Sequence, residues 1–237
     1  AVESPTNQTG NASMANAQGS ASQSSGHAVT MFPTICFITE HPDVEQMNRE
    51  LEQFCLTQET THPRLQTGSI QGGYHSNRQI FDNDNPAIQQ LKKLLIGNAR
   101  SYLNEYWKQE STIPLASVEN LSLQMTGWSV ILRQGDISTP HTHPGAHLSG
   151  VYYVTMSEEA RESQPGAGDL VLVDPRIRAS VAPLQGQKSN AMFTPKSGVS
   201  ILFPSWLEHF VLPFKGEGVR ISIAYNVALS PSAVQRD

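Results

Sequence analysis

Residues 140–154, which read PHTHPGAHLSGVYYV, carry the most information about the fold and the chemistry of this chain. On an extended strand, side chains two positions apart point to the same face, so the rings of His141 and His143 can converge on one ion. A third histidine, His209, comes much later, at the start of another predicted strand. Three imidazoles on one face of a barrel leave the other positions of a transition metal open to substrate or oxygen. We therefore expect a metal site at His141, His143 and His209.

A second chemical signal lies near the end of the chain, at Arg220 and Ser222. The period of two places both side chains on one face of a strand. A guanidinium group binds a carboxylate through two parallel hydrogen bonds, and a neighbouring hydroxyl can donate a third. These residues could hold the far end of a dicarboxylic keto acid. The alternative is that Arg220 pairs with a carboxylate of the protein at the rim of the barrel.

The second half of the chain is predicted to form a β-sandwich or β-barrel, because short runs rich in Val, Ile, Leu and Tyr are broken by Gly and Pro. The strands that we expect there are 121–132, 148–156, 170–173, 199–203, 209–214 and 219–227. Before them, apolar residues at spacings of three and four predict helices over 42–58 and 86–107, each with one apolar face on a sheet. The run 29–38 is predicted to be an edge strand because it contains a proline. Long loops are expected at 157–168 and 174–196.

Composition limits the kind of protein that this chain can be. Its 237 residues, of which 38% are apolar, can form one sizeable core. Residues 1–27 are almost all small or polar and predict a disordered tail, which leaves 28–237 as the domain. The net charge is −5 and the basic residues form no cluster, so the sequence gives no indication of a surface that binds nucleic acid. No apolar run reaches the roughly 18 residues of a membrane span.

Cysteine usage and charge together indicate where the protein works and what it meets. Cys36 and Cys55 have no close Cys or His neighbour, so we expect two buried thiols and a reducing, cytoplasmic compartment. The expected partner is a small-molecule or protein substrate. Neither a membrane nor a nucleic acid is expected, and the sequence leaves a homo-oligomer open.

The order of these motifs resembles the 2-oxoglutarate and iron(II)-dependent oxygenase superfamily, in particular a subfamily of bacterial and phage oxygenases related to prolyl hydroxylases. The resemblance extends over about residues 30 to 228 and is specific over 140–154 and 203–226. It is carried by the two histidines of the first motif, the turn Gly168-Asp169-Leu170, Asp174-Pro175-Arg176, residues 203–209 (FPSWLEH) and Arg220-x-Ser222. The resemblance implies a mainly β fold with flanking helices, a double-stranded β-helix (jelly roll, cupin-like), with iron inside its mouth.

The chain departs from the superfamily pattern at one ligand. The usual motif is His-x-Asp or His-x-Glu with a distal histidine, whereas His143 stands here in place of the carboxylate. Either His141, His143 and His209 bind the metal together, or a carboxylate from elsewhere, such as Asp174, replaces one of them. We favour the three histidines, since the strand period already aims His143 beside His141.

Two further residues are candidates for the site. His147 is evenly spaced from His143, but at roughly 13 Å along a straight strand it is better suited to a substrate contact than to the same ion. Of Tyr152 and Tyr153, parity favours Tyr153 as the one that faces inward beside the cosubstrate, if the strand is continuous. We expect Trp128 to pack in the core.

The resemblance implies an enzyme that uses Fe(II), 2-oxoglutarate and O2 to hydroxylate an unidentified substrate, with release of succinate and CO2. No catalytic residue beyond the metal centre is expected. Two alternatives remain at this point. One is a cupin-type dioxygenase with three histidines, which needs no keto acid and for which Arg220 is dispensable as an anchor. The other is a non-catalytic barrel that binds a metal or another ligand.

Overall fold

The computed structural model describes residues 26–110, 121–157, 164–179 and 181–231. The chain divides into two units, and the second unit begins at Thr34. The predicted disordered tail falls almost entirely on residues 1–25, which lie outside the described residues, so it stays a prediction. Residues 26–33 contain no helix or strand.

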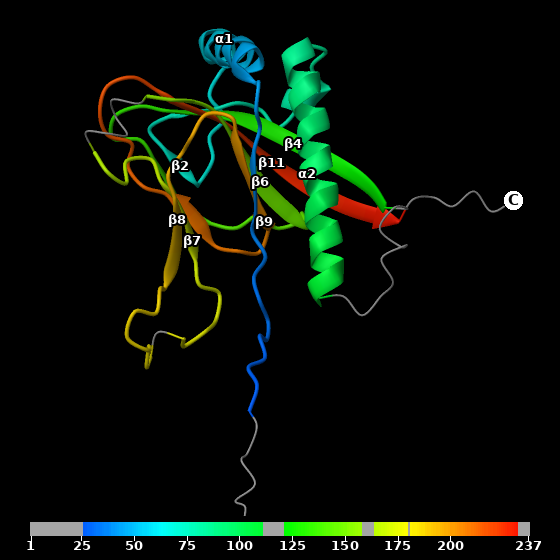
Figure 1. Cartoon of the computed structure of the whole chain (residues 1–237). Coiled ribbons are helices and arrows are strands. Elements are labelled where there is room, and N and C mark those ends of the chain that lie inside the picture. Colours follow the sequence, from blue (N-terminus) through cyan, green and yellow to red (C-terminus); the bar gives the residue numbers. More distant parts are fainter. Residues whose placement is uncertain (1–25, 111–120, 158–163, 180, 232–237) are drawn as a thin grey trace, which may run out of the picture. The chain divides into compact units, whose positions relative to one another are not determined.

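Two antiparallel sheets form the second unit (Figure 1). The six-stranded sheet has the order β1 (Phe37–Glu40), β9 (Val199–Pro204), β6 (Leu148–Met156), β11 (Arg220–Pro231), β4 (Leu121–Leu132) and β3 (Tyr74–His75). The five-stranded sheet has the order β2 (Ile70–Gln71), β5 (Ile137–His141), β10 (His209–Val211), β7 (Leu170–Val173) and β8 (Asn190–Phe193). The mainly β architecture with flanking helices is thereby confirmed.

Two helices, α1 (Glu45–Thr61) and α2 (Pro86–Glu110), cover one face of the six-stranded sheet, and a short 3-10 turn, η1 (Ile80–Asp82), precedes α2. Helix α2 begins after Asn85, whose side-chain oxygen accepts hydrogen bonds from the amides of Ala87 and Ile88. The main apolar core joins Leu51 of α1 and Leu91 of α2 to the strands beneath them. Burying this face of the sheet on the helices leaves its opposite face for the site.

Strand β11 shows how the period of two divides the sheet. Ile221, Ile223, Tyr225 and Val227 belong to the core under the helices. The alternate residues Arg220, Ser222 and Ala224 line a cavity on the other face. One strand therefore contributes both to the core and to the candidate site.

Most predicted elements are present, with differences at their ends. The bounds predicted for β4, β6 and β7 agree with the structure. Strand β1 lies at an edge as predicted but covers only Phe37–Glu40. Strand β8 lies within the predicted loop 174–196, and its largely exposed residues show no apolar alternation that would have revealed it. No helix within the described residues is long and apolar enough to cross a bilayer.

Both cysteines are free, as predicted. Cys55 lies in the core between the helices and the sheet, and Cys36 is partly buried. Burial raises the pKa of each thiol to about 12, so neither is poised to react as a thiolate.

Candidate metal centre

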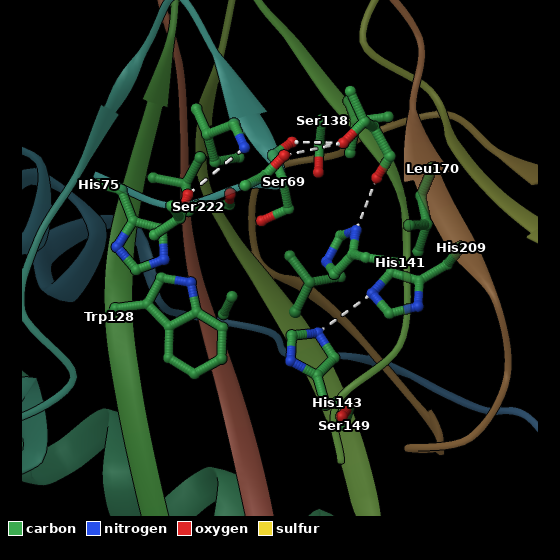
Figure 2. Close-up of a pocket in the computed structure, with 18 of the residues that line it drawn as sticks. Ser69, His75, Trp128, Ser138, His141, His143, Ser149, Leu170, His209 and Ser222 are labelled. Carbon is green, nitrogen blue, oxygen red and sulfur yellow. Dashed lines mark hydrogen bonds between the residues drawn. The ribbon is translucent and has the colours of Figure 1, made fainter. Parts of the chain in front are cut away.

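Three histidines converge on one point between the two sheets (Figure 2). His141 ends β5 and His209 begins β10, and the sheet register places the two directly opposite each other, with ring centroids 4.3 Å apart. His143 lies two residues beyond the end of β5, where its amide donates to the carbonyl of Ser205 at 3.0 Å. The three side chains each offer a nitrogen that lies within 4.8 Å of the other two. The expected convergence of the three rings is therefore present.

His143 reaches the cluster in a different way from the one predicted. Strand β5 ends at His141, so His143 does not lie on an extended strand and its direction does not come from the period of two. The backbone contact with Ser205, just after β9, holds the turn that carries it. Because this contact joins segments far apart in the chain, no local pattern could have predicted it.

Hydrogen bonds to the backbone set the orientation of two of the rings. Nδ1 of His141 donates to the carbonyl of Thr139 at 2.7 Å, and Nδ1 of His209 donates to that of Leu207 at 2.8 Å. A neutral imidazole that donates from Nδ1 keeps a lone pair on Nε2, which is the form that binds metals. Both rings thus present Nε2 as a ligand atom.

The spacing of the nitrogens fits a shared ion. Nε2 of His143 lies 3.2 Å from Nε2 of His209. Two imidazole nitrogens bound at about 2.1 Å from one ion and at right angles to each other are about 3.0 Å apart. The same distance permits a direct hydrogen bond between the rings when no metal is bound. The arrangement therefore fits adjacent positions of a metal with little rearrangement.

The electrostatics of the cluster keep the imidazoles neutral. Burial lowers the pKa of all three, and together with the charge of neighbouring histidines it lowers the pKa to about 3 for His143 and about 4 for His209. At neutral pH no proton has to leave before a metal binds. Within the described residues, the cluster includes no Asp or Glu. The donor set is thus one of three neutral nitrogens, which suits iron, zinc, copper or nickel.

Arg220 is a buried cation at the same cavity. Its side chain is 2% exposed, and it donates from Nε to the carbonyl of Gly168 and from Nη1 to Oγ of Ser222, at 3.1 and 3.0 Å. Among the described residues, no carboxylate lies within the 4.0 Å of an ion pair with it. Asp169, which is also buried, attracts Arg220 electrostatically without forming an ion pair, so the alternative of a protein carboxylate beside the arginine stays open. Because a buried charge without an ion pair is costly, Arg220 is suited to bind an anion that enters the cavity.

Gly168 is required beside this arginine. Its φ of +70° is a conformation that side chains rarely adopt. A Cβ at this position would also lie 3.0 Å from Cδ of Arg220 and 3.3 Å from the ring of Phe214. The Gly-Asp-Leu turn therefore leaves room for the arginine and supplies the carbonyl that orients it.

The cavity has a volume of about 590 Å³ and is lined from both sheets. The three histidines, Arg220 and Ser222 all line it. Tyr153 does not line it. As predicted from strand alternation, Tyr153 points between the two sheets, whereas Tyr152 packs in the core under the helices. Tyr153 is completely buried, and the guanidinium carbon of Arg220 lies 5.1 Å from the centroid of its ring, so its contact is with the arginine.

The structure does not bring His147 or Asp174 to the cluster. His147 is exposed, and its Nδ1 accepts a hydrogen bond from the amide of Leu229. Asp174 pairs with Arg176 at 2.6 Å, which lowers the pKa of the carboxyl to about 2. The even spacing of His147 from His143 did not place it in the cavity, because the chain passes from one sheet to the other between β5 and β6. The period of two does not continue through such a crossing. This geometry gives no support to Asp174 as a replacement ligand.

Sequence reasoning missed three residues of the cavity wall, His75, Arg78 and Trp128. Strand β3 carries His75 beside β4, so that its ring stacks on Trp128 with centroids 5.5 Å apart (Figure 2). The guanidinium carbon of Arg78 lies 5.1 Å from the centroid of the indole ring. Trp128 is buried, as expected of a core residue, but it also faces the cavity, 5.6 Å from the ring of His143. A two-residue strand far from the motif gave no signal that could have revealed this wall.

Comparisons with known proteins agree with this picture. Residues 126–226 match the family model described as "Putative 2OG-Fe(II) oxygenase". That segment contains the three histidines, Arg220 and Trp128. No curated protein sequence matches the chain.

Solved structures of low sequence identity share the fold. A prolyl-4-hydroxylase from Pseudomonas putida is 15% identical, with a TM-score of 0.59 over 82% of this chain and 92% of its own. A prolyl hydroxylase from Trichoplax adhaerens is also 15% identical, with a TM-score of 0.53 over 81% of this chain and 83% of its own. The carbocyclase SnoK of nogalamycin biosynthesis is 10% identical, with a TM-score of 0.56 over 86% of this chain and 84% of its own.

These matches confirm the fold as the double-stranded β-helix that the sequence predicted. The family model, unlike the structural likeness, also concerns the chemistry, because it matches the segment that carries the histidine cluster and the buried arginine. Residues 126–226, the segment that carries the candidate metal centre, are thus similar to the family described as a putative 2OG-Fe(II) oxygenase.

Proposed function

We propose that His141, His143 and His209 hold the iron of this oxygenase, that Arg220 and Ser222 bind the far carboxylate of 2-oxoglutarate, and that the enzyme hydroxylates its substrate. The observation that carries the proposal is the pairing of a neutral three-nitrogen cluster with a buried, ion-pair-free guanidinium in one cavity. A metal site alone would also fit a three-histidine dioxygenase that needs no keto acid. The buried arginine is the feature that such an enzyme would not require.

Iron(II) held by these histidines would supply chemistry in which O2 oxidises both the keto acid, to succinate and CO2, and a C–H bond of the substrate, to C–OH. The chain's own contribution is to position the reactants and to limit access of water. Thr139 and Leu207, through their carbonyls, hold two imidazoles in the ligand form before any metal arrives. Such preorganisation means that little order has to be created on binding.

Arg220 acts on the cosubstrate. Its bonds to Gly168 and Ser222 fix the plane of the guanidinium, and Tyr153 packs against it. A carboxylate that reaches this group exchanges water for charge-assisted hydrogen bonds in a buried environment, where they are strong. Leu132, which lies opposite Arg220 on β4, lines the cavity together with the apolar Leu170 and Val211, so part of the wall that the acid meets is apolar.

Hydroxylation is the reaction that we propose among those found on this fold. The structural matches include enzymes named as prolyl hydroxylases and others named as an epimerase and a carbocyclase, so the fold alone does not select the reaction. In the described part of the cavity wall there is no Asp or Glu that could act as a general base or acid. Hydroxylation of carbon is the reaction that needs no acidic or basic side chain of this kind.

We also propose a cytoplasmic location, which the two free cysteines support. Free thiols are typical of reducing compartments, whereas secreted domains tend to pair them.

The proposal is tested with the full chain loaded with iron(II). We expect aerobic incubation with 2-oxoglutarate to give succinate and CO2 in equal amounts, and anaerobic incubation to give neither. The His209→Ala variant should lose both metal and turnover. A separate measurement uses zinc(II), which has no redox chemistry, to follow 2-oxoglutarate binding by calorimetry. A metal-loaded protein that fails to bind the keto acid would contradict the proposal.

A further inference from the structure

A second arginine lies at the cavity and has no role in the function proposed so far. Arg78 follows β3, is exposed, and lines the same cavity as the histidines. Among the described residues, no carboxylate lies within the 4.0 Å of an ion pair with it. Its guanidinium carbon lies 5.1 Å from the centroid of the Trp128 ring. An arginine stacked on an aromatic ring keeps its N–H groups available at its edges.

The register of the sheet separates Arg78 from the keto-acid anchor. On β11 and β4, Arg220 lies opposite Leu132, and Ala224 lies opposite Trp128. Four residues of strand correspond to about 13 Å. Arg78 lies over Trp128, and the Trp128 ring is 5.6 Å from that of His143. Arg78 is thus beside the metal ligands, where a substrate has to present its C–H bond, and well away from Arg220.

The platform under Arg78 is held firmly. Trp128 is 4% exposed and stacks on His75, with 13° between the ring planes. Nδ1 of His75 donates to the carbonyl of Ser76 at 2.6 Å, and Oγ of Ser76 accepts a hydrogen bond from the amide of Ser129. These bonds tie β3 to β4 and fix the indole ring. A guanidinium resting on a fixed ring loses less freedom when it binds a ligand than a free surface arginine does.

The charge of the cavity also favours an anion. Among the described residues, its lining contains two arginines and no aspartate or glutamate. A divalent metal and the two guanidinium groups exceed the two negative charges of 2-oxoglutarate, because the ligand set supplies no carboxylate. Positive potential therefore remains at the open side of the cavity when the cosubstrate is bound.

We infer that Arg78, supported by Trp128, binds an anionic group of the substrate, a carboxylate or a phosphate, and thereby places the bond to be oxidised beside the three histidines. This inference rests on the proposed function, since it assumes that 2-oxoglutarate occupies the Arg220 end. It assigns the substrate to the organic acids or phosphate esters, or to a peptide that bears an acidic group at that point. The alternative, in which Arg78 only shields Trp128 from solvent, is separated by experiment.

The test uses the full chain loaded with zinc(II) and saturated with 2-oxoglutarate, so that no turnover occurs and Arg220 is occupied. The probes are benzoate, benzamide and phenyl phosphate, which share one ring and differ in charge. Their dissociation constants are measured by calorimetry for wild type, Arg78→Gln and Arg100→Gln. Arg100 is a matched control because it is exposed on α2 and does not line the cavity.

We expect wild type and Arg100→Gln to bind at least one of the two anions about tenfold more tightly than benzamide, and Arg78→Gln to reduce that ratio to about two, a loss of about 1 kcal/mol. Whichever anion shows the larger ratio identifies carboxylate or phosphate as the recognised group. Equal binding of all three probes to wild type, no binding of either anion, or an anion preference that survives in Arg78→Gln would overturn the inference. Failure of the proposed function is a different result: the zinc-loaded wild type would not take up 2-oxoglutarate in the first place.

Discussion

Replacing Arg220 by glutamine tests the keto-acid site most directly. The guanidinium can offer a carboxylate two charge-assisted hydrogen bonds, each with a net contribution of about 2 kcal/mol, and a glutamine amide can restore one neutral bond of about 1 kcal/mol. The expected loss is about 3 kcal/mol, or a rise of about 150-fold in the dissociation constant of 2-oxoglutarate. Burial of Arg220 justifies the upper part of the range for charged bonds, because water competes little at a 2% exposed side chain.

The measurement is a calorimetric titration of 2-oxoglutarate onto zinc-loaded protein, with the metal content of each sample determined in parallel. Zinc content should not change, since Arg220 belongs to β11 and is not one of the three clustered ligands. Arg176→Gln serves as the matched control because Arg176 is exposed and already pairs with Asp174. An Arg220→Gln protein that keeps full metal and binds the keto acid within threefold of wild type would refute the reasoning and favour the dioxygenase that needs no keto acid.

Three further predictions follow from the same geometry. His143→Asp should increase the retention of iron during dialysis, because an anionic ligand replaces a neutral one, and unchanged iron stoichiometry and activity would count against a ligand at that position. The metal-free protein should lose stability as the pH falls from about 6.5 to about 4. The reason is that His209 and His143 have pKa values of about 4 and about 3 in the folded state, so over this range they bind protons only in the unfolded chain. Urea unfolding at pH 7.5, 6 and 4.5 measures the change, and a free energy of unfolding that does not vary with pH would contradict the burial of these rings. Gly168→Ala should weaken 2-oxoglutarate binding by roughly tenfold or more while leaving metal binding intact, because the new Cβ lies 3.0 Å from Cδ of Arg220; calorimetry decides, with equal affinity as the contrary result.

The predicted fold was accurate where the sequence pattern was long and periodic. The helices and the strands β4 and β6 were recognisable because their apolar residues recur regularly, and the four-residue β7 because all its residues are apolar. The short strands β2, β3 and β8 were not recognisable, because they are too short for a period and none is a continuous apolar run. The omission matters for function, since β3 carries His75 and the segment after it carries Arg78.

Sequence alone indicated which residue types meet at the centre: motif order pointed to the three histidines, and motif order with the strand period pointed to Arg220 and Ser222. Only the tertiary structure decided how they meet. The pairing of β5 with β10 sets His141 against His209, and a backbone bond to Ser205 turns His143 toward them after its strand has ended. The same is true of Arg78 on Trp128, which depends on the pairing of β3 with β4. The physical reason is that local patterns report which face a side chain takes along one strand, whereas contacts between strands distant in the chain arise from the packing of the whole sheet.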